Sequence, residues 1–242
     1  MVTTAVIMAA GMGTRFGDMT TEIPKGFINA GNKPMIIRSV ETLLASGIRR
    51  IIIGTGFKKE LYNNLAHKHP EIECIYSPSY ASTNSMFTLW NCRQAVGEDD
   101  ILVLESDLVF EKKAITELII NPYANVMLCA DVTKFQDSYY LEYNQNLELV
   151  NCSVNENDLL VCGEMVGIHK LSNSFYNQLC SYYSTIINQK PKMGYEFALL
   201  HLAQVVEPVH VHKIPDLIWY EIDDYNDLMF AEKNIISKLS RN

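Results

Sequence analysis

The stretch that decides the fold is Thr4-Ala5-Val6-Ile7-Met8-Ala9, which runs directly into Ala10-Gly11-Met12-Gly13-Thr14-Arg15. Its first half is a short apolar run with β-branched residues, and it stops where the glycines begin. A run of this kind, bounded by glycine, predicts a strand buried on both faces of a parallel sheet. We therefore expect a strand over 4–9 and a functional loop directly after it.

The rest of the first half alternates between predicted strands and helices. Apolar residues at helical spacing predict a helix over 34–46, and Gly47 is placed to end it. Further strands are expected at 50–55, 73–76 and 101–104, and further helices at 59–68 and 85–96. This order predicts βαβ units and a mainly parallel α/β sheet flanked by helices. In such sheets, ligands bind beyond the carboxyl ends of the strands.

After about residue 120 the regular alternation ends. The segment 139–154 alternates like an antiparallel ribbon, with turn residues at 144–146. Other elements are expected at 125–130, 159–168 and 209–214 for strands and at 172–188, 195–205 and 226–239 for helices. No linker-like segment separates the two parts, so we expect a single domain over 1–242, with halves at about 1–120 and 121–242.

Composition excludes several classes of protein. The 242 residues are 48% hydrophobic and 20% charged, which is close to the globular average. The formal net charge of -8 argues against a non-specific binder of nucleic acid or of anionic membranes, because those partners require a basic face. No apolar run approaches the roughly 20 residues that span a bilayer. The six cysteines show no paired spacing, so we expect free thiols and a cytoplasmic location.

The glycine loop after the first predicted strand is suited to a polyphosphate. Small residues and glycines let the backbone N–H groups approach phosphate oxygens. Arg15 and Lys25, which follows Pro24 ten residues later, can neutralise charge on the α-phosphate and the leaving pyrophosphate. An ordinary glycine turn is the alternative. The loop lacks the Gly-Lys-Ser/Thr of a Walker motif and the third glycine of a dinucleotide fingerprint.

Two pairs of carboxylates follow apolar segments far apart in the chain. Glu105-Ser106-Asp107 ends the predicted strand at 101–104, and Glu221-Ile222-Asp223 lies near the C-terminal end of the sequence. In a strand, residues two apart point to the same side, so each pair can line one site. Carboxylates at this edge of a parallel sheet are hard-oxygen ligands for Mg²⁺. A solvated acid at a strand end is the alternative.

Together these motifs resemble the cytidylyltransferase branch of the sugar-nucleotidyltransferase superfamily. Several longer segments, spread over nearly the whole chain, are similar to 2-aminoethylphosphonate cytidylyltransferases, with phosphocholine cytidylyltransferases as near relatives. These segments are 24–27, 53–56, 80–86, 104–108, 191–196 and 219–223. The resemblance implies a Rossmann-like nucleotidyltransferase fold with a small antiparallel elaboration at the acceptor site. It also implies a CTP-binding half over about 1–120 and an acceptor-binding half over about 121–242.

The resemblance further implies roles for individual residues. Lys25 and Arg15 would be the triphosphate and transition-state cations, and Asp107 and Asp223 would bind Mg²⁺. The CTP-binding surface would comprise Ala9, Ala10, Gly11, Met12, Gly13, Thr14, Ser82, Asn84 and Ser85. The reaction would be attack of a phosphonate oxygen on the α-phosphorus of CTP, with CMP transferred and pyrophosphate released. Whether such a chain forms a homodimer or is fused to another enzyme domain stays open.

The identity of the acceptor depends on how its amine is bound. A primary ammonium, as in 2-aminoethylphosphonate, requires carboxylate or hydroxyl acceptors, whereas the quaternary ammonium of phosphocholine favours an aromatic cage. Glu196 is the first candidate for the ammonium, and Lys192 could hold the phosphonate. The remaining acceptor candidates are Asp131, Tyr195, Trp219 and Glu221. Tyr139, Tyr140, Tyr195 and Trp219 could instead form an aromatic box, so residue types leave both acceptors open.

Overall fold

The computed structural model describes residues 2–134 and 138–239. Within these ranges a nine-stranded mixed sheet forms the centre, and its N-terminal strands lie parallel in the order β6-β1-β4-β5. Their bounds are Thr4–Ala9 for β1, Arg50–Thr55 for β4, Ile72–Tyr76 for β5 and Ile101–Glu105 for β6. The predicted α/β sheet, parallel in this half, is confirmed.

The strands of the second half join the same sheet. They are β8 (Val126–Ala130), β9 (Tyr140–Tyr143), β10 (Leu149–Ser153), β11 (Gly163–Leu171) and β12 (His210–Ile214). β11 runs antiparallel to β6, β8 and β9, and β9 with β10 is the expected antiparallel ribbon. The strand expected at 159–168 begins later, because residues Glu156–Asp158 form a 3-10 turn, η3, and pairing with β9 starts at Gly163.

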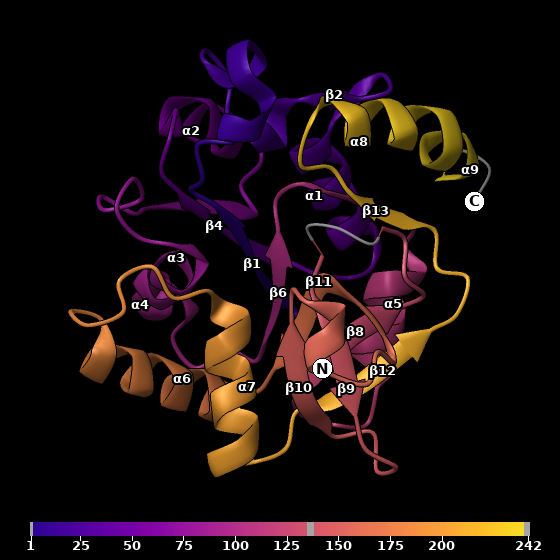
Figure 1. Ribbon diagram of the computed structural model, residues 1–242. Coiled ribbons are helices and arrows are strands. Elements are labelled where there is room, and N and C mark those ends of the chain that lie inside the picture. The colour runs from indigo at the N-terminus through magenta and orange to yellow at the C-terminus, as the bar shows by residue number, and fades with distance from the viewer. Residues whose placement is uncertain (1, 135–137, 240–242) are drawn as a thin grey trace.

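Helices cover both faces of the sheet (Figure 1). One face packs against α1 (Met35–Ala45), α2 (Lys59–Ala66) and α5 (Lys113–Ile120), and the other against α3 (Ser85–Asn91), α4 (Arg93–Val96), α6 (Asn173–Ile186) and α7 (Tyr195–Val205). Alternate residues of β1 serve the two faces, with Ile7 in one apolar core and Val6 in the other. The helix predicted over 85–96 is divided at Cys92, and α5 was not predicted.

A third apolar cluster joins the end of the chain to the glycine loop. It contains residues of a 3-10 helix, η1 (Thr14–Thr20), of β2 (Asn29–Ala30), of the paired strands β7 (Leu108–Phe110) and β13 (Trp219–Glu221), and of α8 (Tyr225–Ala231), η4 (Glu232–Ile236) and α9 (Ser237–Leu239). A second 3-10 helix, η2 (Lys25–Phe27), precedes β2, and β2 pairs with β3 (Lys33–Pro34). The helix predicted over 226–239 is therefore interrupted by η4, a π turn.

The β7–β13 pair sets the position of the two acidic segments. Its antiparallel register places Glu221 opposite Leu108, and the backbone N–H of Ile222 donates to the Asp107 carbonyl at 3.0 Å. Asp107 and Asp223 are thereby held side by side, although they lie more than a hundred residues apart in sequence.

Two further findings concern the whole described chain. None of its helices, over 2–134 and 138–239, has the length and apolar character needed to cross a membrane. Its six cysteines are free thiols, as their spacing predicted.

Candidate active site

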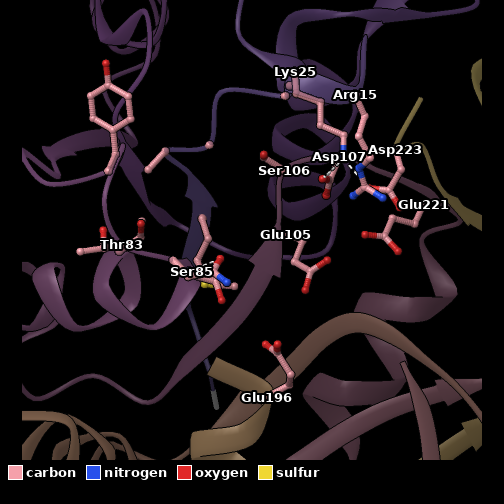
Figure 2. Close-up of a pocket in the computed structure, with 18 of the residues that line it drawn as sticks. Arg15, Lys25, Thr83, Ser85, Glu105, Ser106, Asp107, Glu196, Glu221 and Asp223 are labelled. Atoms are coloured by element: carbon pink, nitrogen blue, oxygen red, sulfur yellow. Dashed lines mark hydrogen bonds and ion pairs between the residues drawn. The ribbon is translucent and has the colours of Figure 1, made fainter. Parts of the chain in front are cut away.

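A cavity of about 310 Å³ lies at the carboxyl ends of β1 and β6. Its wall is formed by the glycine loop, by the segment before and at the start of α3, by both acidic segments and by the start of α7. Figure 2 shows Arg15, Lys25, Asp107, Asp223 and Glu221 at one end, with Thr83, Ser85 and Glu196 farther away. The sheet edge predicted to bind the ligand is therefore the edge that carries the cavity.

The glycine loop forms one side of the cavity and positions Lys25. Gly11 has no heavy atom within 4 Å of the place where a Cβ would be, so its backbone is open to a ligand. Gly13 has φ of 62°, and a Cβ there would lie 3.0 Å from the Cβ of Lys25. A larger residue at Gly13 would therefore be strained and would also displace Lys25.

Lys25 is the central cation of the site. Its Nζ lies 2.5 Å from Asp107 Oδ2 and 2.7 Å from Asp223 Oδ1. Burial alone would lower the pKa of Lys25, but the charges of Asp107, Asp223 and Glu221 outweigh burial and raise it. Lys25 is therefore ionised at every pH near neutrality, as a cation for a triphosphate must be.

Asp223 is surrounded by cations of the described chain. Arg15 Nη2 lies 2.6 Å from Oδ1, Lys25 contacts the same oxygen, and Lys134 Nζ lies 3.1 Å from Oδ2. Burial would raise the pKa of Asp223, but these three cations hold it below its ordinary value. Asp223 is thus an ionised carboxylate, as a metal ligand or a cation anchor requires.

Lys134 is the member of this charge cluster that the sequence did not indicate. It also contacts Asp227 at 3.1 Å and the Glu221 carbonyl at 3.3 Å, and its side chain is 12% exposed. The cluster of carboxylates raises its pKa, although burial opposes this. No motif surrounds Lys134 in the sequence, and its partners lie about ninety residues later, so only the fold reveals the contact.

Three carboxylates converge on one point of the wall. Ligand oxygens of Glu105, Asp107 and Glu221 all lie within 4.8 Å of one another. Burial, followed by the charge of Asp107, raises the pKa of Glu105 to about 8, and burial with the charge of Glu105 raises the pKa of Glu221 well above its usual range. Such acids repel one another unless a proton or a cation lies between them.

Glu196 faces the cavity from the first turn of α7. It is 4% exposed, and its carboxyl folds back over Gly194, where a Cβ would lie 1.9 Å from its Oε1. Burial raises the pKa of Glu196, while a hydrogen bond from Tyr139 opposes that rise. Among the described aromatic residues, Tyr62, Tyr80 and Tyr139 line the cavity. Of the four residues considered for an aromatic box, Tyr139 therefore lies at the wall, and Tyr140, Tyr195 and Trp219 lie outside it.

The structure brings together most of the residues chosen from the sequence. The catalytic and metal candidates all line the cavity, and so do Ala10, Gly11, Gly13, Asn84, Ser85, Glu196 and Glu221. The residues that lie outside the wall are Ala9, Met12, Thr14, Ser82, Asp131, Lys192, Tyr195 and Trp219. The roles predicted for all of these residues stay predictions.

The residues outside the wall have other contacts that explain their positions. Asp131 pairs with Lys213 at 3.0 Å on the surface, and Lys192 lies in a separate groove beside α6. Trp219 is 1% exposed and packs in the apolar core on the face of the sheet that α1, α2 and α5 cover. Tyr195 is fully buried, and its hydroxyl donates to Glu105 at 2.7 Å.

Comparison with known proteins places this geometry in a family. Residues 4–133 match the family model for nucleotidyl transferases. The chain belongs to the nucleotidyl transferase family. The matched range covers more than half of the chain, from the first strand of the sheet through the glycine loop, Lys25 and Asp107.

Individual relatives of this nucleotidyl transferase confirm the resemblance noted in its motifs. It is 29% identical over 113 residues to 2-aminoethylphosphonate cytidylyltransferase of Lancefieldella rimae. The matched residues make up 47% of this chain and 46% of that relative. It is 32% identical over 98 residues to choline-phosphate cytidylyltransferase of Streptococcus pneumoniae. The matched residues make up 40% of this chain and 42% of that relative. The nucleotidyl transferase thus spans about half the length of these curated relatives.

The fold of the nucleotidyl transferase is also found in solved structures. CTP:phosphocholine cytidylyltransferase from Streptococcus pneumoniae superposes with a TM-score of 0.82 at 19% identity, covering 96% of this chain and 99% of the other. At this identity the likeness establishes the Rossmann-like nucleotidyltransferase fold alone. The predicted fold class is confirmed.

Proposed function

We propose that the chain transfers CMP from CTP to a small aminated phosphonate, such as 2-aminoethylphosphonate, and releases pyrophosphate. One observation carries this proposal. The cavity has two cationic side chains beside the glycine loop, the half-buried Lys25 and the exposed Arg15, and a separate buried carboxyl, Glu196, at the start of α7. A triphosphate fits the first group by charge, and an ammonium fits the second.

The acceptor needs little chemical activation. A phosphonate oxygen is already an anion, so it can attack the α-phosphorus of CTP without a strong general base. The new bond joins phosphonate oxygen to phosphorus, and the bond to the bridging oxygen of pyrophosphate breaks. The work left to the protein is positioning and charge neutralisation. Lys25, between Asp107 and Asp223, supplies a fixed positive charge at that end of the cavity.

The acidic cluster fits a divalent cation such as Mg²⁺. Asp107 Oδ2 contacts Lys25, but its buried Oδ1 has no hydrogen-bond partner among the described residues. Glu105 and Glu221 add oxygens beside it, and Asp223 adjoins it through Lys25. These are the hard-oxygen ligands that Mg²⁺ prefers. The bound cation would offset the negative charge of the triphosphate. Arg15 and Lys25 alone cannot do so, because the neighbouring carboxylates already offset their positive charge.

Glu196 favours a primary amine over a quaternary one. A carboxylate accepts hydrogen bonds from an N–H group, and a trimethylammonium group has none to donate. Phosphocholine remains the second candidate, since the Tyr139 ring adjoins Glu196 and packs edge-on against Phe197 at 5.8 Å. One ring offers only part of an aromatic cage.

The test is a pyrophosphate-release panel. Purified protein with Mg²⁺ receives each of four nucleoside triphosphates together with 2-aminoethylphosphonate, phosphocholine or a sugar 1-phosphate. We expect the largest kcat/KM with CTP and 2-aminoethylphosphonate. Preference for phosphocholine would overturn the acceptor and keep the reaction class, and preference for a sugar phosphate would overturn both the acceptor and the use of Glu196.

A further inference from the structure

A buried chain of hydrogen bonds lies behind the carboxylates of the cavity. The Tyr195 hydroxyl contacts Glu105 Oε1 at 2.7 Å and His169 Nε2 at 2.8 Å. Both rings are completely buried, and only Glu105 reaches the cavity wall. Tyr195 therefore connects the interior of the protein to the acidic cluster without lining the cavity itself.

The protons of this chain can be assigned. When Glu105 is ionised, as a bound cation requires, the phenol donates its single proton to Glu105 and His169 donates its Nε2–H to the phenol oxygen. Burial lowers the pKa of His169 to about 3, so the imidazole is neutral. Its Nδ1 has no hydrogen-bond partner among the described residues. The tautomer of His169 and the orientation of Tyr195 are thus fixed by one another.

On a second side, the Glu105 carboxyl lies against the backbone of a glycine in β11. β11 shifts register between Met165 and His169, and Gly167 within this bulge has φ of 76°. A Cβ at Gly167 would lie 3.0 Å from the carboxyl carbon of Glu105 and 3.0 Å from Oε2. The carboxyl is therefore confined between Tyr195, which binds Oε1, and the bulge beside Oε2.

Tyr195 also links this carboxyl to the other end of the cavity. It is the first residue of α7, next to Glu196, and its backbone N–H donates to Ser85 Oγ at 3.1 Å. One residue thus contacts the acidic cluster through its side chain and the predicted nucleotide surface through its backbone.

We propose that Tyr195, held by His169, is a positioning residue that sets the Glu105 carboxyl for a divalent cation, and that it ties the cation site to the helix that carries Glu196. The proposal rests on the proposed function insofar as the acidic cluster binds a divalent cation. It replaces the direct acceptor contact predicted for Tyr195 from the sequence. Partners that orient a metal ligand in this way commonly change metal affinity 10–100-fold when they are removed.

The test measures cation binding in the absence of substrates. Mn²⁺ is titrated into the purified protein alone, and free Mn²⁺ is followed by electron paramagnetic resonance. Tyr195→Phe keeps the ring and removes the hydroxyl, and we expect its Kd for Mn²⁺ to rise by about 10-fold. His169→Leu should weaken Mn²⁺ binding in the same direction, and His169→Gln, whose side-chain N–H can replace Nε2–H, should restore most of the affinity.

Tyr176→Phe is the matched control. Tyr176 is fully buried on the same face of the sheet, and its hydroxyl donates to the Leu89 carbonyl at 2.6 Å, away from the cavity. Its variant loses one buried hydrogen bond and should bind Mn²⁺ like the wild type. Melting temperatures of all variants separate a loss of stability from a loss of affinity.

Several outcomes would overturn the proposal. They are unchanged Mn²⁺ affinity in Tyr195→Phe, an equal loss of affinity in Tyr176→Phe, and no Mn²⁺ binding by the wild type. Because the titration contains neither nucleotide nor acceptor, its result is independent of which substrates the enzyme uses. A failed substrate panel with intact Mn²⁺ effects would refute the proposed function alone.

Discussion

At the scale of single residues, the site depends on charges that compensate one another. Lys25 lies between Asp107 and Asp223, and Asp223 in turn contacts Arg15 and Lys134. Removing one member of such a cluster leaves the others uncompensated in a partly buried place. Substitutions here should act on chemistry and on stability together, so each needs a control for folding.

Lys25→Ala should lower kcat by on the order of 10²-fold or more, the usual effect of losing one group that stabilises charge in the transition state. Lys33→Ala is the control, since Lys33 pairs with Glu41 at the surface of the same N-terminal segment. Steady-state kinetics with circular dichroism spectra checks both variants. A folded Lys25→Ala enzyme with the kcat of the wild type would refute the role of Lys25.

Glu196→Gln should raise the KM for 2-aminoethylphosphonate by roughly 10-fold, the effect of losing a hydrogen bond to a charged group. The KM for CTP should stay unchanged. Glu164→Gln provides a buried comparison, because Glu164 is 1% exposed, accepts from Ser138 and Thr133, and lies outside the cavity wall. If only the KM for CTP changed in Glu196→Gln, the acceptor site would have to lie elsewhere.

The same variant makes a prediction about pH and stability. Burial raises the pKa of Glu196 in the folded state, so folding favours its protonated form. Its contribution to stability is complete below the ordinary pKa of glutamate and is lost as pH rises through the folded pKa. The side chain of the Glu196→Gln variant cannot ionise. The melting temperature of this variant, relative to that of the wild type, should therefore rise as the pH increases from 4 to 8. Since about 1 kcal/mol corresponds to roughly 2–4 °C at this size, thermal scans can detect it.

At the scale of elements, the sequence predicted those segments whose pattern is local. β1, β4 and α7 have the predicted bounds, because an apolar run or a helical stripe is visible within each segment. The short α5 was not foreseen, since eight residues give only two turns of periodicity. The β7–β13 pair depends on residues more than a hundred positions apart, and no local pattern records such pairing.

The glycine loop gives a prediction at this scale. Alanine at Gly11 would meet no heavy atom within 4 Å in the free protein, so Gly11→Ala should keep the melting temperature of the wild type. If phosphate oxygens approach this backbone, the added methyl group should raise the KM for CTP several-fold.

Gly17→Ala is the comparison for Gly11→Ala. Gly17 has φ of 55° and open space around it, so alanine there strains the backbone and should lower the melting temperature without affecting CTP. Melting curves and the KM for CTP measured on both variants make the contrast. A Gly11→Ala enzyme with unchanged KM would show that the loop does not contact the nucleotide.

At the scale of the whole molecule, the cavity gathers segments from both halves of the chain. The first half contributes the glycine loop, Lys25 and Asp107, and their order along parallel strands made their convergence predictable. The second half was harder to predict, because nearness to a motif in sequence does not give nearness in space. Trp219 and Lys192 lie beside Glu221 and Glu196 in the broader motifs, yet the fold directs one into the core and the other to a separate groove.

The most direct test of cytidylyl transfer is to observe the bond that forms. Phosphorus NMR of the protein with CTP, Mg²⁺ and 2-aminoethylphosphonate should show the phosphonate signal replaced by a coupled phosphonate–phosphate pair, with pyrophosphate rising in equal amount. The same mixture with phosphocholine should react more slowly. Pyrophosphate without the coupled pair, or no change in the phosphonate signal while another acceptor is consumed, would contradict the account.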